Sequence, residues 1–113
     1  MATYSNGIQV TDSGSLAIPG SVNSGNSDTT YTVPANKYAI ISVSRNIGGS
    51  QSADNVSSFY VGAGSTVTYR RSFHLNSQTH RTCLVNGVNI LETGGGANAN
   101  LLTIEYVEFG NFN

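Results

Sequence analysis

The segment at positions 30–45, TYTVPANKYAIISVSR, constrains the fold more than any other part of the sequence. Its two halves are rich in β-branched and aromatic residues, which suit a pleated, half-buried surface. Between the halves, Pro34 cannot donate to a sheet ladder and Asn36 tolerates a left-handed backbone. Both residues therefore favour a corner between strands, and the segment predicts two β-strands joined by a turn.

Short strands and turns continue through the rest of the chain. The Asn86-Gly87 pair between two apolar runs favours a type I′ turn, and therefore a tight β-hairpin. No window carries apolar residues at helical spacing, so negligible helix is expected. The predicted strands cover residues 30–33, 37–44, 56–61, 66–69, 71–75, 82–85, 88–91 and 101–109. Loops or turns are predicted at 47–55, 62–64 and 77–80, and between residue 94 and the last strand.

The last predicted strand is apolar on both faces. One face carries Leu102, Ile104 and Tyr106, and the other carries Leu101, Val107 and Phe109. Such a strand is expected to be covered on both sides, by a second sheet and by something else. Glu105 and Glu108 fall on opposite faces, which limits how fully either side is covered.

These patterns predict an all-β fold with about seven to nine short strands, a number typical of sandwiches. We expect a two-sheet antiparallel β-sandwich of jelly-roll type, with an extended N-terminal arm. A chain of 113 residues is long enough for one domain. The sandwich is assigned to residues 29–113. Residues 1–28 are Ser/Gly/Asn-rich and are interpreted as a polar arm or as a pair of short strands, able to add to the sheet edge of a neighbouring subunit.

The chain carries little charge. Charged residues make up 10% of the sequence and the net charge is −1, whereas about 25% charged residues is usual. A surface of neutral hydroxyls and amides suits a protein that is covered by partners, so we expect a homo-oligomer. The five basic residues form no stripe, which argues against nucleic-acid binding. No hydrophobic stretch follows Met1, so neither a signal peptide nor a membrane span is expected.

The residue patterns of common enzymes are missing from the sequence. No serine lies in a Gly-x-Ser-x-Gly elbow, and the glycines at 94–96 precede neither a Lys-Ser/Thr pair nor a helix. Glu105 and Glu108 point to opposite faces of one strand, so they are badly placed to share a substrate. Cys83 lies in an apolar run and is expected to be a buried, inert thiol. We therefore predict a non-enzymatic protein without a cofactor or a metal.

Binding residues are harder to assign. Tyrosine mixed with serine, glycine and asparagine is typical of adaptable binding surfaces. The histidines suggest either a metal pair or a pH-sensitive contact. The simpler interpretation, in which tyrosines fill strand positions and histidines lie in a polar loop, is favoured. The candidate contacts for a partner or receptor are Tyr69, Arg70, Arg71, His74, His80 and Arg81.

Three elements in order resemble a known class of domain. They are TYTVPANKYAIISVS, CLVNGVNIL and GGGANANLLTIEYVEF. The chain resembles, over roughly residues 29 to 109, the small β-sandwich domains of tailed-bacteriophage virion proteins, which include head decoration proteins, head fibres and tail-fibre tips. Asn36 stands where those domains usually have glycine, and it keeps the turn chemistry.

The resemblance implies a non-enzymatic virion protein, often a trimer, that is made in the host cytoplasm and finishes in the virion. A fibre would ordinarily carry a shaft, and the sequence has neither heptads nor repeats. The expected function is therefore that of a capsid decoration or cement protein, which binds the major capsid protein or another virion protein and stabilises the head. The alternative is the tip module of a tail fibre or head fibre that binds a host receptor or a surface glycan.

Overall fold

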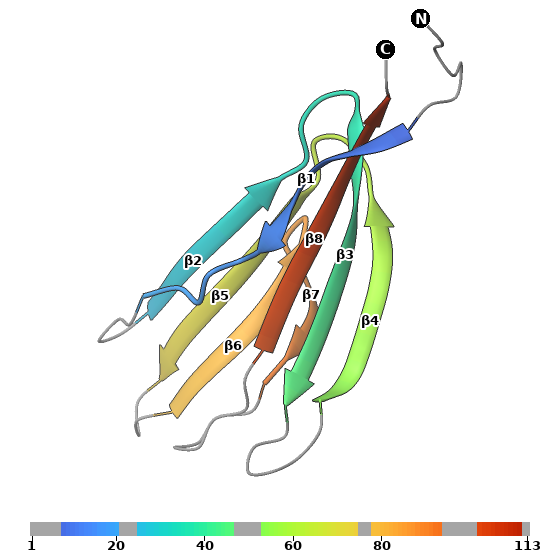
Figure 1. Cartoon of the computed structure of the whole chain (residues 1–113). Coiled ribbons are helices and arrows are strands. Elements are labelled where there is room, and N and C mark those ends of the chain that lie inside the picture. The colour runs from blue at the N-terminus through green and yellow to red at the C-terminus, as the bar shows by residue number, and fades with distance from the viewer. Residues whose placement is uncertain (1–7, 21–24, 47–52, 75–77, 94–101, 112–113) are drawn as a thin grey trace, which may run out of the picture.

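The computed structural model describes residues 8–20, 25–46, 53–74, 78–93 and 102–111. These residues contain no helix and form eight strands (Figure 1). The strands are β1 (Ile8–Ser15), β2 (Gly25–Thr32), β3 (Lys37–Asn46), β4 (Ala53–Val61), β5 (Thr66–His74), β6 (Gln78–Val85), β7 (Val88–Glu92) and β8 (Leu102–Asn111).

The strands form two antiparallel sheets of four strands that pack face to face. Sheet A has the order β1-β8-β3-β4, and sheet B has the order β2-β5-β6-β7. The first strand lies beside the last, while the β3–β4, β5–β6 and β6–β7 connections stay within one sheet. The prediction of an all-β, two-sheet antiparallel sandwich without helix is confirmed.

The N-terminal segment takes part in the sandwich. β1 pairs with β8 at the edge of sheet A, and β2 pairs with β5 at the edge of sheet B. Of the two interpretations of residues 1–28, the pair of short strands therefore holds for the residues that the structure describes. β1 completes the sheet of its own chain.

One hydrophobic core fills the space between the sheets. Sheet A contributes Ile41 and Val43 from β3 with Ile104 from β8, and sheet B contributes Val67 and Tyr69 from β5. Each of these side chains is almost fully buried, and burying an apolar side chain of this size stabilises a fold by about 1.5–3 kcal/mol. The Tyr69 hydroxyl donates a hydrogen bond to the backbone carbonyl of Leu102 on the opposite sheet. The core therefore ties β5 to β8 by packing and by a buried hydrogen bond.

The turns predicted at Asn36 and at Asn86-Gly87 are confirmed by their backbone angles. Asn36 has a φ of 64°, the left-handed conformation expected of it between β2 and β3. In the hairpin of β6 and β7, Asn86 has a φ of 51° and Gly87 a φ of 83°. Positive φ at both central residues is the requirement of a type I′ turn.

Replacing Gly87 with Ala is expected to lower the free energy of unfolding by about 1 kcal/mol, because a Cβ atom disfavours the left-handed region. No atom lies within 4 Å of that Cβ position, so the cost is conformational. Gly62→Ala is the control, since its position is equally open and has no positive φ. Urea unfolding of the two variants measures the difference, and equal stabilities would refute this account of the turn.

Several strand boundaries differ from the sequence prediction, and two strands begin within segments that were predicted to be loops. β6 begins at Gln78, although residues 77–80 were predicted to be a polar break, and β4 begins at Ala53 within the predicted loop at 47–55. His80 pairs with Ser72 of β5, and Ala53 pairs with Asn46 of β3. Ladder pairing with an adjacent strand thus extends both strands into polar sequence, which hydrophobic periodicity alone does not detect.

Cys83 is fully buried, as predicted, and burial raises the pKa of its thiol to about 12. Because the thiolate is the reactive form, we expect the native protein to react with a thiol reagent at pH 8 roughly a thousandfold more slowly than the unfolded protein. Reaction with Ellman's reagent, with and without urea, measures this ratio. Fast labelling of the native chain would show that the interior opens readily.

Candidate functional site

The outer face of sheet A carries a continuous group of apolar and aromatic side chains, here called the apolar face. Inward positions of β3 and β8 hold the core, so the alternate positions of these strands point outward. Register places Phe109 beside both Val10 and Tyr38, and Ile40 beside both Val107 and Tyr60. The apolar face crosses all four strands and consists of Ile8, Val10, Tyr38, Ile40, Tyr60, Val107 and Phe109.

Three aromatic rings form a row across the apolar face. The Tyr38 ring stacks on Phe109 with a centroid distance of 5.3 Å, and it meets Tyr60 at 5.9 Å in a tilted arrangement. Rings at these distances attract one another and restrict one another's rotation. The three rings are therefore already restricted before a partner binds. Binding would cost these side chains little additional conformational entropy.

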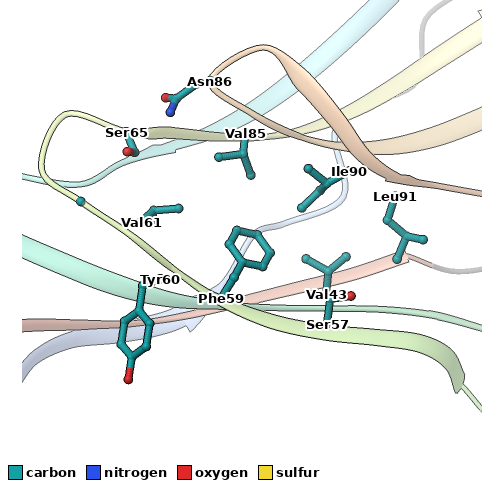
Figure 2. A pocket seen from close by; sticks show the side chains of 11 residues that line it. Val43, Ser57, Phe59, Tyr60, Val61, Ser65, Val85, Asn86, Ile90 and Leu91 are labelled. Atoms are coloured by element: carbon teal, nitrogen blue, oxygen red, sulfur yellow. The ribbon is translucent and has the colours of Figure 1, made fainter.

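The rim of the apolar face is open to water. Tyr60 is 71% exposed, and Ile8 and Val10 are 55% and 56% exposed. Tyr60 points away from the interior of the sandwich, as Figure 2 shows. Contiguous exposed apolar groups of this kind mark interaction surfaces on soluble proteins, and aromatic enrichment with few charges is the composition of an interface core.

The other half of the same face is polar. Ser42 and Ser58 lie side by side, with 3.2 Å between their Oγ atoms, and Glu105 stands two residues before Val107 on β8. Ser13 and Ser15 continue the polar half on β1. The outer face of sheet A is thus divided along its strands into an apolar half and a polar half, and protein interfaces combine both kinds of surface.

A second feature, which the sequence analysis missed, is a buried carboxylate between the sheets. The side chain of Glu108 is 5% exposed. It accepts hydrogen bonds from Thr11 Oγ1 and from the Tyr31 hydroxyl, each at 2.7 Å, and from Lys37 Nζ at 3.4 Å. At Gly110, a Cβ atom would lie 3.2 Å from a methyl carbon of Thr11, so the glycine leaves room for this arrangement.

Electrostatics at Glu108 favour the ionised form. The hydrogen bond from Thr11, then the one from Tyr31, lower the pKa of Glu108, and Lys37 adds to the effect although burial opposes it. Burial and the hydrogen bond to Glu108 raise the pKa of Tyr31, which keeps this phenol protonated. The Tyr31 ring also stacks on Tyr106 at 4.1 Å. Because Tyr31 lies in sheet B and Glu108 in sheet A, this network ties the sheets together.

The predicted contact residues do not form one patch. They all lie on the paired strands β5 and β6, but strand alternation divides them between two faces. Arg70 is on the outer face of sheet B, where its Nε and Nη2 atoms bind the carboxylate of Asp28 at 2.9 and 3.1 Å. Arg71 and Arg81 pair across the strands on the inner side, and their Nε atoms are buried. The prediction that Tyr69 contacts a partner is wrong, because this core residue is only 1% exposed.

The two histidines lie at the same end of the β5–β6 hairpin. His80 pairs with Ser72, and its Nδ1 atom is 3.2 Å from the carboxylate of Glu92. His74 pairs with Gln78, and its side chain is outside the described part of the structure. Among the residues described, no three His, Cys, Asp or Glu side chains are grouped closely enough to hold a metal ion.

No family model matches the chain, and no curated protein or solved structure matches it either. Within the described ranges, no helix has the length and hydrophobicity needed to cross a membrane. The surfaces of the sandwich are therefore the basis for assigning a function.

Proposed function

We propose that the protein is a non-enzymatic structural component of a bacteriophage virion, a capsid decoration or cement protein that binds other protein subunits through the outer face of sheet A. The observation that carries this proposal is the apolar face, with its exposed rim and its row of three aromatic rings. The resemblance of the sequence to small virion β-sandwiches supplies the virion context.

The dimensions of sheet A fit a protein–protein contact. Four strands spaced about 4.8 Å apart, with ten residues rising about 3.4 Å each, give a face of roughly 19 by 34 Å, or about 650 Å². A standard interface buries about 800 Å² on each partner. The whole outer face, with the relief of its side chains, therefore approaches the standard size, while the apolar half alone would give a weak contact.

The proposed mechanism is passive. The subunits associate with copies of themselves as a homo-oligomer and clamp neighbouring major capsid subunits. Each contact is modest, but many symmetric copies hold the shell together more strongly than any single contact. A neutral surface supports this arrangement, because copies with little charge do not repel one another when they crowd on a shell.

Particles stripped of the protein are expected to release DNA at a lower temperature than complete particles. Adding the purified protein back should restore the higher temperature, and adding the Val107→Asp variant should not. A fluorescent DNA dye measures the release temperature during heating. Equal release temperatures for stripped and complete particles would refute the cement function.

A second candidate function is a fibre-tip module that binds a receptor or glycan. It is supported by the exposure of Tyr60 beside Tyr38, since tyrosine is the residue that adaptable binding surfaces use most. Copy number separates the two functions. Hundreds of copies on each particle would agree with decoration, whereas a handful of oligomers together with glycan-array binding would agree with a fibre tip.

A further inference from the structure

A cavity of about 490 Å³ opens between the two sheets on the side formed by β4 and β7 (Figure 2). Both layers supply apolar walls. The walls from sheet A and sheet B are Val43, Phe59, Val61, Val85, Ile90 and Leu91. In Figure 2, Phe59 and Val61 project into the space between the layers, and Ile90 and Leu91 project toward them from the opposite side.

A β-bulge shapes this cavity. Leu84 pairs with Asn89 and Cys83 pairs with Leu91, so Ile90 is an extra residue on β7. A bulge redirects side chains from strict alternation. As a result, the consecutive residues Ile90 and Leu91 both line the cavity, and β7 presents a wider apolar wall than a regular edge strand would.

The rim of the cavity carries neutral polar groups. Ser57 and Ser65 contribute hydroxyls, and Asn86 contributes a side-chain amide. The Oδ1 atom of Asn86 accepts a hydrogen bond from the backbone N–H of Thr66 at 2.9 Å, which fixes the orientation of the amide. None of the described residues that line the cavity carries a formal charge.

We propose that this cavity is a binding site for a neutral, largely apolar small molecule, with a hydroxyl or carbonyl end at the rim. Pockets that bind small molecules typically have a volume of about 300–1,000 Å³, apolar walls and a few oriented polar groups. A charged ligand is disfavoured, because burial would leave its charge unpaired. The volume has room for about 16 water molecules at liquid density. A single side chain inserted from another subunit would therefore not fill it. Tyr60 borders both surfaces, but its ring turns away from the cavity (Figure 2), so the cavity and the apolar face share only this residue.

The test uses the full chain and the neutral fluorescent probe N-phenyl-1-naphthylamine. Saturable binding of one probe per chain is expected. Ile90→Trp, which places a larger side chain in the cavity, should weaken binding at least tenfold. Asn89→Trp is the matched control. It adds the same side chain one position earlier, on a residue that does not line the cavity, and should bind within about twofold of the original protein.

Val85→Phe provides a second filled variant on β6, and thermal melting verifies that each variant is folded. Reduced probe binding by both filled variants, with unchanged binding by the control, would support the site. Absent or unsaturable binding, or equal binding by filled and control variants, would overturn it. A filled variant that changes the oligomeric state, in a protein that binds no probe, would also overturn it by showing that another subunit covers the cavity. None of these outcomes depends on the apolar face, so the two proposals fail separately.

Discussion

Replacing Glu108 with Gln is expected to lower the free energy of unfolding by about 2 kcal/mol at neutral pH, since hydrogen bonds to a charged group contribute about 1.5–3 kcal/mol. The carboxylate accepts short hydrogen bonds from Thr11 and Tyr31 and lies near the ammonium group of Lys37. An amide keeps one acceptor atom, but its NH₂ group faces donors and it offers Lys37 no charge. Urea denaturation followed by circular dichroism measures the loss.

Glu105→Gln is the matched control for this substitution. Glu105 lies on the same strand, but it is exposed on the opposite face. Its replacement should change stability by no more than about 0.5 kcal/mol. If both variants lost the same stability, the loss would come from net charge or strand propensity, and the proposed link between the sheets would be wrong.

The contribution of Glu108 should depend on pH in a defined direction. Its pKa is lowered in the folded protein from an ordinary value of 4.5. A lowered carboxyl pKa stabilises the folded state above the unfolded pKa, and the stabilisation is lost as the pH falls through the folded pKa. The stability difference between the original protein and Glu108→Gln should therefore shrink below about pH 4.5. A constant difference down to pH 2 would contradict the lowered pKa.

Replacing Val107 with Asp is expected to dissociate the proposed homo-oligomer into monomers. Val107 lies in the apolar face between Ser13 of β1 and Ile40 of β3. A carboxylate at this point would be buried by any subunit that covers the face, and burying an unpaired charge is far more costly than a weak interface can offset. We expect the affinity of self-association to fall at least a hundredfold, equivalent to about 2.7 kcal/mol. Size-exclusion chromatography with light scattering measures the mass.

Thr103→Asp controls for the added charge. Thr103 lies on the same strand as Val107 and points outward in the same way. However, it lies in the polar half of the face, beside Ser44. The control variant should keep the mass of the original protein. If both substitutions dissociated the oligomer equally, charge repulsion would explain the result without a specific role for the apolar face.

The strand pattern was largely predictable because its signals are local. The Pro34–Asn36 corner and the Asn86-Gly87 turn depend on the backbone preferences of single residues, and both are confirmed. The starts of β4 and β6 were not predictable in this way. Their first residues are held by pairing with a neighbouring strand, and hydrophobicity does not report that pairing.

The apolar face was only partly predictable. Apolar residues on both faces of the last strand indicated that its outer side needed a cover. However, the strand order β1-β8-β3-β4 is what brings Val10, Phe109, Tyr38 and Tyr60 side by side. The six candidate contact residues do not lie on a single surface, because consecutive residues such as Tyr69 and Arg70 point to opposite sides of a strand.

The Glu108 network and the cavity had no usable sequence signal. Thr11, Tyr31, Lys37 and Glu108 come from four different strands, so only the packing of the sheets brings them together. The cavity depends on the bulge at Ile90, where one extra residue on β7 changes the direction of the side chains. Both features arise from long-range pairing.

Hydroxyl-radical footprinting of Tyr60 tests most directly whether the outer face of sheet A is an assembly surface. The ring is 71% exposed in the single chain, so its oxidation reports whether another subunit covers it. In the assembled protein, Tyr60 should be oxidised several-fold more slowly than in the Val107→Asp variant, while buried Tyr69 should react slowly in both. Equal, rapid oxidation of Tyr60 in the two proteins would show that the apolar face stays open to water and would contradict the proposed function.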